Sequence, residues 1–335
     1  MAIKGSGLAG SATLQTVRSS PVRQFLDAYR NRKVFRAPLK FGHDGWIGNN
    51  GDKLIALGAD RLLREHGVCL VDSPSVADLI LLDGNGGMHD KYQAIPGIFR
   101  RLAAAYPKTP IVMLPASYFF STGQMAELIG DRDGSVTLFC RERYSYDHLL
   151  KDHQLPEICR VELDHDLAFH LSDEDWVSAL RDSVAETVLI VDRLDAENVT
   201  TDFRRSWQFD LRRQVGRTIP PPLRKRLYPV GARLLGARKT PMRRRSEQLL
   251  AEYFPDEKRP SIVAMDISLP KCCSFHDFCR HIAEAKVIFT TRLHVGIFAS
   301  VLGRTTFIFE GPYHKIRGVY EHSLAGVPGV HLVES

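Results

Sequence analysis

Short apolar runs alternate with segments of helical periodicity along most of this sequence. The runs read ADLILLD, PIVML, VTLFC, TVLIVD, KVIFT and TTFIF, at residues 77–83, 110–114, 136–140, 187–192, 286–290 and 305–309. Helical spacing separates them, for example over residues 97–106, 144–152, 274–285 and 293–302. Strands that are apolar throughout and separated by helices are typical of a parallel sheet covered on both faces. The sequence therefore predicts an α/β fold of the doubly wound class.

The alternation runs in two series of similar length, joined near residue 170. A chain of 335 residues is long enough for two domains. We expect a Rossmann-like N-terminal domain over residues 1–171 and a Rossmann-like C-terminal domain over 172–335, facing each other across a cleft. Ligands of open α/β sheets bind at the carboxyl ends of the strands, so the cleft is the predicted site.

Positive charge is concentrated in one segment. The chain has 45 Lys and Arg against 39 Asp and Glu, a net charge of +6. The window 204–245, called the basic insert below, holds 14 of these bases and one acid, so it carries +13 and the rest of the chain −7. Its bases alternate with Leu, Tyr and Val, which is typical of a segment that lies on an anionic membrane surface; a solvated loop is the alternative. No aromatic platform or known module accompanies it, so we expect no nucleic-acid partner.

Other features bear on compartment and cofactors. The first 30 residues lack the apolar core of a signal peptide, and no apolar run is long enough to span a membrane. Six scattered cysteines are typical of reduced thiols. We therefore expect a cytoplasmic protein, either free or peripheral at the membrane face. Residues 272–281 lack the paired cysteine spacings of zinc sites, and Gly5-x-Gly-x-x-Gly10 has no strand before it, so we expect neither metal nor dinucleotide.

The loop GWIGNNGD, residues 45–52, runs into a predicted amphipathic helix at 53–66, although no convincing apolar strand precedes the loop. A glycine-rich loop at a helix N-terminus exposes backbone N–H groups to an anion. Asn50 and Asp52 could thus contact a phosphate, a carboxylate or a sugar hydroxyl. The alternative is a tight turn in which Asp52 caps the helix.

Two further loops follow predicted strands. GNGGMH, residues 84–89, offers Asn85 and His89, and its glycines permit close approach of a ligand. Arg141 follows the VTLFC strand and would point into the cleft, where its planar fork suits carboxylate or phosphate. The alternatives are a plain turn for the first loop and a surface pair of Arg141 with Glu142 for the second.

The KVIFT strand delivers Arg292 and His294 to the start of an apolar helix. Histidine titrates near neutral pH and suits proton transfer, and a nearby arginine could hold an anionic substrate beside it. The loop after the TTFIF strand adds Lys315 to this edge. A structural histidine and a solvated charged loop are the alternatives.

These motifs in this order resemble the polysaccharide pyruvyl transferase family. The matching features are GNNGD at 48–52, GNGG at 84–87, Arg141-Glu142 with Ser145, the segment 164–171, and Thr291-Arg-Leu-His294 followed by a helix, a strand and a Lys-containing loop. The resemblance spans roughly residues 40–325, and its Arg-Leu-His element is the most specific part.

The resemblance implies a fold similar to the GT-B glycosyltransferases and transfer of pyruvate from phosphoenolpyruvate to two hydroxyls of a sugar. The products would be a cyclic ketal and phosphate. His294 would be the acid/base, and Arg141, Arg292 and Lys315 would hold the donor. The sugar acceptor in such pathways is commonly lipid-linked. Phosphoenolpyruvate would be a co-substrate, and no cofactor is required.

Two other functions remain open on the sequence. A nucleotide-sugar glycosyltransferase of the same fold would use an acidic residue on the donor ribose, for which Glu310 is the candidate. A non-catalytic protein of carbohydrate or membrane assembly would retain the fold without turnover.

Overall fold

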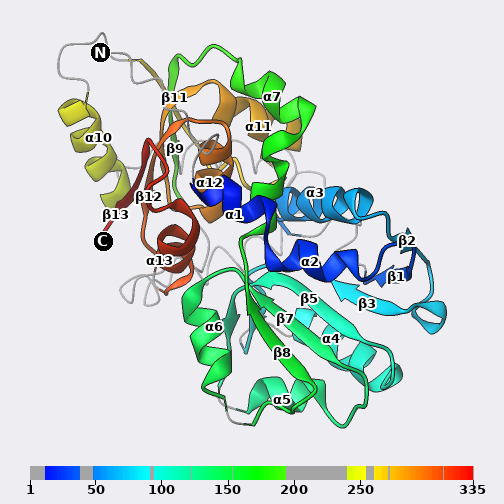
Figure 1. The fold of residues 1–335 in the computed structure, drawn as a ribbon. Helices are drawn as coiled ribbons and strands as arrows, with labels where there is room; N and C mark the ends of the chain where they lie inside the picture. Colours follow the sequence, from blue (N-terminus) through cyan, green and yellow to red (C-terminus); the bar gives the residue numbers. More distant parts are fainter. Residues whose placement is uncertain are drawn as a thin grey trace, which may run out of the picture.

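The computed structural model describes residues 12–37, 48–90, 94–121, 123–152, 154–193, 240–253, 260–270, 272–311 and 313–334. Most of the basic insert, residues 204–239, lies outside this part of the chain. Two parallel sheets dominate the described part, and helices pack on both (Figure 1). The α/β class with two parallel sheets, predicted from the alternating apolar runs, is confirmed.

The first sheet has six parallel strands in the order β2-β1-β3-β5-β7-β8. Their bounds are β1 Lys33–Arg36, β2 Cys69–Leu70, β3 Leu79–Leu82, β5 Ile111–Ala116, β7 Val136–Cys140 and β8 Cys159–Leu163. A separate two-stranded ladder joins β4 (Met88–His89) to β6 (Tyr118–Phe119). The helices of this half are α2 Pro21–Asp27, α3 Asn50–Glu65, α4 Ala94–Ala105, α5 Gln124–Ile129 and α6 Arg143–Leu150, with a short 3₁₀ turn at Pro74–Val76.

The second sheet has five parallel strands in the order β10-β9-β11-β12-β13. Their bounds are β9 Thr187–Val191, β10 Ser261–Ala264, β11 Ala285–Thr290, β12 Thr305–Phe309 and β13 Val330–Val333. The helices of this half are α7 Asp175–Arg181, α10 Pro241–Tyr253, α11 Phe275–Ala283, α12 Leu293–Val301 and α13 Lys315–Val319, followed by a π-helical turn, η5, at Tyr320–Leu324. No helix in the described ranges is long and apolar enough to cross a membrane.

A strand, β1, precedes the first glycine loop, where the sequence shows no convincing apolar strand. Its sequence KVFR is short and has charged ends, so it lacks the apolar run that marks a buried strand. It nevertheless pairs with β2 and β3, and only Val34 is fully buried. The helix after the loop also begins earlier than expected, at Asn50.

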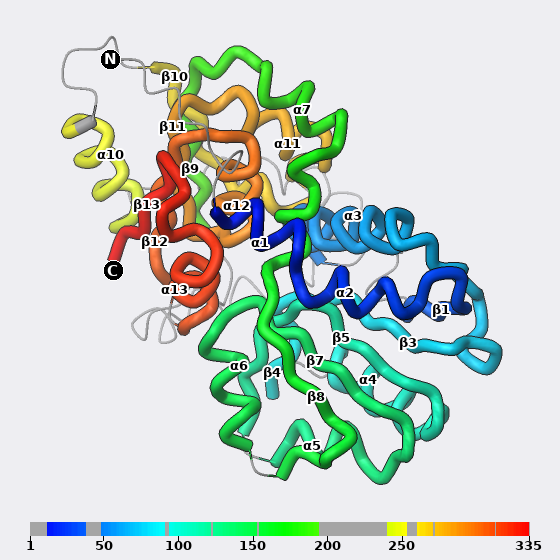
Figure 2. Tube along the Cα trace, in the orientation of Figure 1, coloured from blue at the N-terminus to red at the C-terminus, as the bar shows by residue number. Residues whose placement is uncertain are grey.

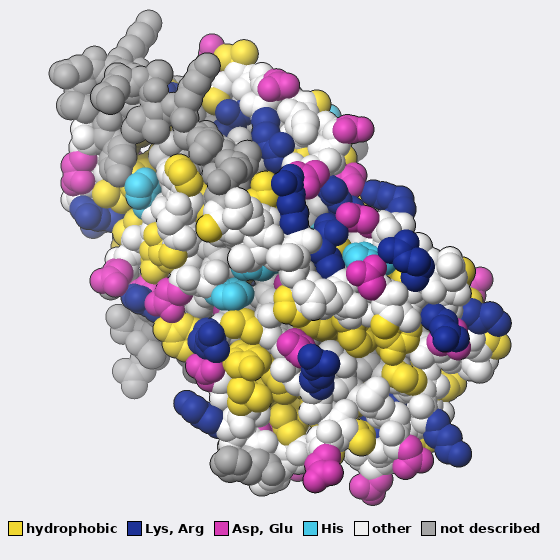
Figure 3. Space-filling model, in the orientation of Figure 1, with side chains coloured by type: hydrophobic (Ala, Val, Ile, Leu, Met, Phe, Trp, Pro, Cys, Tyr) yellow, Lys and Arg dark blue, Asp and Glu magenta, His cyan; other side chains and the backbone are white. Residues whose placement is uncertain are grey.

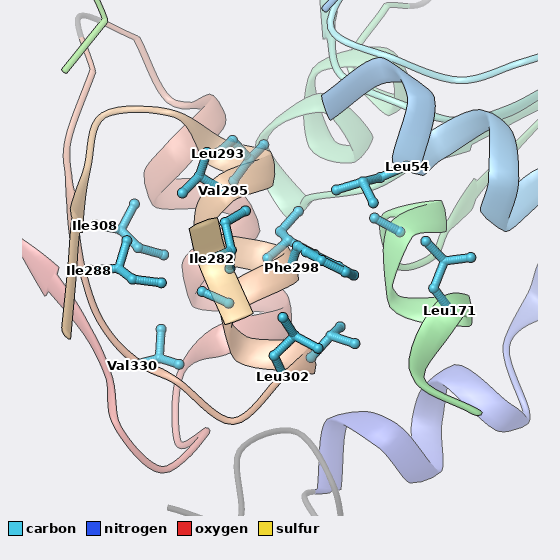
Figure 4. Packing of buried hydrophobic residues seen from close by; sticks show 14 of the residues in the cluster. Leu54, Leu171, Ile282, Ile288, Leu293, Val295, Phe298, Leu302, Ile308 and Val330 are labelled. Atoms are coloured by element: carbon cyan, nitrogen blue, oxygen red, sulfur yellow. The ribbon is translucent and has the colours of Figure 1, made fainter. Parts of the chain in front are cut away.

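Helix α12 is the centre of the larger core. It is apolar on all sides, as expected of a helix that is buried all round. In Figure 4, its side chains lie between strand residues on one side and residues of α3 and of the 3₁₀ segment η2 (Leu167–Asp173) on the other. The labelled residues are Leu54, Leu171, Ile282, Ile288, Leu293, Val295, Phe298, Leu302, Ile308 and Val330.

Helix α3 belongs by connectivity to the first half, but it packs against the second as well. Figure 2 shows it at the boundary between the two halves, and it contacts η2, α11 and α12. The N-terminal helix α1 (Ala12–Arg18) likewise contributes Leu14 and Val17 to the core around α12. The division at residues 171 and 172 stays a prediction.

Charged side chains of both signs are interspersed over the described surface of the face in Figure 3. This pattern agrees with the mixed charge of the chain outside the basic insert. The predicted membrane binding concerns the basic insert, most of which lies outside the described residues.

Glycine at position 58 permits the close approach of α3 to η2. A Cβ added to Gly58 would lie 2.1 Å from the carbonyl oxygen of Leu167, which is backbone and has little room to move. We expect Gly58→Ala to destabilise the protein by about 1–3 kcal/mol, because α3 and η2 would have to separate. The measurement is the free energy of unfolding in urea.

Gly97→Ala in α4 is the matched control. There the new Cβ would meet only the end of the Arg101 side chain, at 3.6 Å, and alanine favours the helix by about 0.5–1 kcal/mol. Equal stability of the two variants would contradict the packing argument.

Candidate functional site

A pocket of about 380 Å³ opens between the two halves of the molecule. This volume is within the usual range of small-molecule sites. Its lining comes from loops and helix N-termini of both halves: Gly48, Asn49, Asp52, Asn85, Gly86, Gly87, Ala94, Ile95, Arg141, Arg193, Ser268, Arg292, Leu293, His294 and Lys315. Six of the residues predicted from the sequence line this pocket, namely Asp52, Asn85, Arg141, Arg292, His294 and Lys315.

Asp166 joins two of the predicted site residues. Its Oδ2 atom lies 2.7 Å from Nη1 of Arg141 and 3.3 Å from Nε2 of His294. Arg141 also donates from Nε to the hydroxyl of Ser117 at 2.9 Å. Arg141 comes from the end of β7, Asp166 from the segment before η2, and His294 from the first turn of α12. One buried carboxylate thus positions a cation and a titratable ring from opposite halves.

The charge state of Asp166 follows from these neighbours. Burial by itself would raise the pKa of the carboxyl group. The charges of His294 and Arg141, together with hydrogen bonds from His294 and from the Ala168 backbone, outweigh burial and hold the pKa of Asp166 below its usual range. Asp166 is therefore an anion at neutral pH.

Arg292 has a carboxylate partner of its own. Its guanidinium group meets Asp266 in a two-point pair, with Nε 3.2 Å from Oδ1, and both side chains are almost fully buried. Such a pair fixes the plane of the guanidinium group. Asp266 also accepts a hydrogen bond from the Ser268 backbone at 3.2 Å, and Ser268 lines the pocket.

Lys315 reaches the pocket from the start of α13. The position that a Cβ on Gly86 would occupy lies 3.5 Å from Nζ of Lys315 and 3.2 Å from Nη2 of Arg141. Both cations therefore lie over the glycine loop after β3, next to Asn85. The Asn85 side chain turns this loop by accepting a hydrogen bond from the Gly87 backbone at 2.6 Å.

The N-terminus of α3 forms another side of the pocket. Asn49, not Asp52, is the N-cap: its side chain accepts from the Gly51 backbone at 2.7 Å, while Asp52 accepts from the Asn49 backbone at 2.8 Å. The alternative in which Asp52 caps the helix is therefore wrong. Asp52 still lines the pocket, within the first turn of a 16-residue helix whose dipole favours anions nearby.

Asn50 and His89 are not among the pocket-lining residues. The Asn50 amide donates to the carbonyls of Ile267 and Cys273, at 2.9 and 3.0 Å, and so ties α3 to the second half. His89 is nearly buried, with Nδ1 2.6 Å from Asp90. Binding roles for these two residues stay predictions, and the structure adds a structural role for Asn50.

Sequence reasoning gave no role to Asp166, Asp266, Arg193 or Ser268. Asp166 lies in the segment 164–171 noted in the sequence, but nothing there marked it as the partner of Arg141. Glu310, the candidate for a nucleotide ribose, lies outside the pocket lining and pairs with Arg317 at 2.5 Å. Cys272, Cys273 and Cys279 are free thiols, and no group of three or more metal-ligating side chains occurs among the described residues.

This arrangement can bind a small, multiply charged anion and move a proton beside it. Four lining residues are arginine or lysine, and the first turns of helices α3, α4, α12 and α13 all contribute lining residues. His294 supplies an imidazole ring, a group suited to proton transfer.

The buried pair of Arg141 and Asp166 gives a stability prediction. Arg141→Met should cost about 3–5 kcal/mol of unfolding free energy, because it leaves a buried carboxylate without its arginine. The double variant Arg141→Met/Asp166→Asn should recover part of that loss in a double-mutant cycle.

Arg30→Met is the control, since Arg30 and Asp27 are both more than half exposed and such pairs contribute at most about 1 kcal/mol. A loss for Arg141→Met no greater than that of the control would show that the buried pair does not stabilise the fold.

Comparisons with known proteins bear on the fold and on the family. A search of curated proteins gives no match. Among solved structures, the chain is similar to a functionally uncharacterized protein from Klebsiella pneumoniae, with a TM-score of 0.58 and 19% identity over 94% of this chain and 97% of that one. At this identity the likeness shows the fold alone.

A family model supplies the remaining evidence. The model for polysaccharide pyruvyl transferase matches residues 25–311, a span that includes His294 and both buried arginine–aspartate pairs and ends just before Lys315. Because this match covers most of the sequence, the chain belongs to the polysaccharide pyruvyl transferase family.

Proposed function

We propose that this protein transfers the pyruvyl group of phosphoenolpyruvate to two hydroxyls of a sugar, forming a cyclic ketal and releasing phosphate. The observation that carries the proposal is the convergence of Arg141, Arg292, Lys315 and His294 on one pocket between the two sheets. We also infer that the two halves are Rossmann-like domains in a GT-B-like arrangement, divided near residue 171.

Phosphoenolpyruvate fits the charges of this pocket. It is small and carries a carboxylate and a phosphate, so several cations must surround it. Arg141 and Lys315 lie together over the Gly86 loop, and Arg292 lies at the N-terminus of α12. We propose that these cations bind the carboxylate and the phosphate of the donor. The N-terminus of α3 and Asp52 would border the bound donor. Asn50 would hold the N-terminus of α3 in place beside the donor through its hydrogen bonds to the second half.

His294 is the proposed acid and base. A proton passes to the methylene carbon of the donor while a sugar hydroxyl attacks the adjacent carbon and loses its own proton. The C–O bond to phosphate then breaks, and the second hydroxyl closes the ring and gives up its proton. Asp166, 3.3 Å from the imidazole, stabilises the protonated ring, and the arginines stabilise the charge that develops on the leaving phosphate.

The proposed acceptor is a lipid-linked oligosaccharide. It would enter the pocket from the side on which Asn85 and His89 lie. An enzyme acting on it would be a cytoplasmic protein at the membrane face, held there by the basic insert 204–245. Flotation with anionic and neutral vesicles tests membrane binding. We expect the protein to float with anionic vesicles and not with neutral ones. Absence of binding to both kinds of vesicle would contradict the proposed membrane role.

The catalytic assignment is tested with His294→Asn. We expect phosphate release from phosphoenolpyruvate, assayed against a panel of oligosaccharides, to fall by about 10²–10⁴ because proton transfer is lost. Phosphoenolpyruvate should still raise the melting temperature of the variant, since the cations remain.

His276→Asn is the matched control, because His276 is 87% exposed and is not one of the pocket-lining residues. Near-wild-type phosphate release by His294→Asn would overturn the role of this histidine. Stabilisation by nucleotide sugars and not by phosphoenolpyruvate would favour a glycosyltransferase.

The position of the His294 ring gives a second prediction. A Cβ on Gly51 would lie 2.7 Å from Cβ and Nδ1 of His294, so Gly51→Ala should displace the ring from Asp166. We expect turnover to fall at least about tenfold, as catalysis is sensitive to small misplacements. Steady-state assays of phosphate release measure this, with Gly97→Ala as the control; unchanged turnover in Gly51→Ala would contradict the assigned geometry.

A further inference from the structure

Five aromatic side chains form a cluster beside the Lys315 side of the pocket: His89, Phe119, Tyr144, Tyr313 and His314. We propose that this cluster is a subsite that binds a hexopyranose ring of the acceptor saccharide. The proposal rests on the proposed function, since it takes the neighbouring pocket as the donor site.

The rings of the cluster contact one another across the two halves. Phe119 lies 4.7 Å from His89, 6.2 Å from Tyr313 and 5.6 Å from His314, measured between ring centroids. Tyr144 stacks on His314 at 5.4 Å with an interplanar angle of 19°. His89 and Phe119 come from the β4–β6 ladder, and Tyr144 from α6, whereas Tyr313 and His314 follow β12. A ligand here would therefore contact both halves.

Two members of the cluster are unusually exposed. Phe119 is 44% exposed and Tyr144 41%, although most other large apolar side chains of this protein are buried. Phenylalanine is among the residues most often found inside proteins. Exposed aromatic rings beside a cavity mark a surface that a ligand can cover.

Lys315 connects the cluster to the pocket. Its Nζ atom lies 5.2 Å from the centroid of the Tyr313 ring, and the same lysine lines the pocket next to Gly86 and Arg141. A sugar on the aromatic surface would thus lie beside the donor cations, as an acceptor must if its hydroxyls are to reach the transferred carbon.

The chemistry of the cluster favours a sugar ring. Aromatic faces are electron-rich and attract groups with partial positive charge, such as the C–H bonds on one face of a pyranose. Hydroxyls at the edge of that ring need polar partners, and the imidazoles of His89 and His314 with the carboxylate of Asp90 lie within or next to the cluster. The mixture of aromatic and polar groups suits a saccharide better than a lipid tail.

The test measures sugar binding without turnover. Saturation-transfer NMR is recorded on the full chain with methyl glycosides of glucose, galactose and mannose, whose aglycone has no ring of its own. We expect transfer to the ring protons of at least one glycoside, and about fivefold weaker binding in Phe119→Ala and in Phe119→Leu, since leucine keeps apolar volume but lacks the aromatic face.

Leu150→Ala is the matched control. Leu150 is 53% exposed and ends α6, and it is outside the cluster, so this variant should bind glycosides as the wild type does. Stabilisation by phosphoenolpyruvate is measured in parallel and should be the same in all variants, which shows that they are folded and that the donor pocket is intact.

The outcomes separate the subsite from the proposed reaction. Absence of transfer to every glycoside in the wild type, or equal transfer in the Phe119 variants, overturns the aromatic subsite. Failure of phosphoenolpyruvate to bind the wild type counts against the proposed donor, while selective loss of glycoside binding in the Phe119 variants supports the subsite in either case.

Discussion

The contact of Asp166 with both Arg141 and His294 is the interaction on which the site depends. Its carboxylate is almost fully buried, and it joins a cation from the end of β7 to a histidine at the start of α12. A buried charge is costly unless it is paired, so the fold must hold all three groups in place together. The three groups of the site therefore come together only when the two halves are docked as in this structure.

Helix α3 adds further contacts between the two halves. Its glycine at position 58 lets it approach the Leu167 backbone, Asn50 bonds to carbonyls of the second half, and Gly51 lies against His294. These contacts tie the N-terminus of α3 to the second half. At the pocket, the pairs of Arg141 with Asp166 and of Arg292 with Asp266 hold both guanidinium groups in defined orientations.

Fold and site differ in how far the sequence predicted them. Apolar runs such as LILL and VTLFC mark buried strands because neither face of a central parallel strand meets water, and they were found at β3 and β7. Strand β1 was not predicted, because its sequence KVFR has charged ends and lacks an apolar run. Arg141, Arg292, His294 and Lys315 were predicted because they follow strands at the carboxyl edges of the two sheets. Asp166 and Asp266 were not, because the residues with which they pair lie in other elements of the fold, between 25 and 128 residues away along the chain.

By itself, the sequence determined the class of fold, the strand ends that carry the charged residues, and the family resemblance. Those properties are local: periodicity, loop composition and motif order are set by neighbouring residues. Only the tertiary structure decided that Asp166 faces both Arg141 and His294, that the Asn50 amide binds Ile267 and Cys273, and that Phe119 meets Tyr313 and His314 beside Lys315. Such pairings depend on packing between segments more than 100 residues apart in most cases, and no local pattern encodes them.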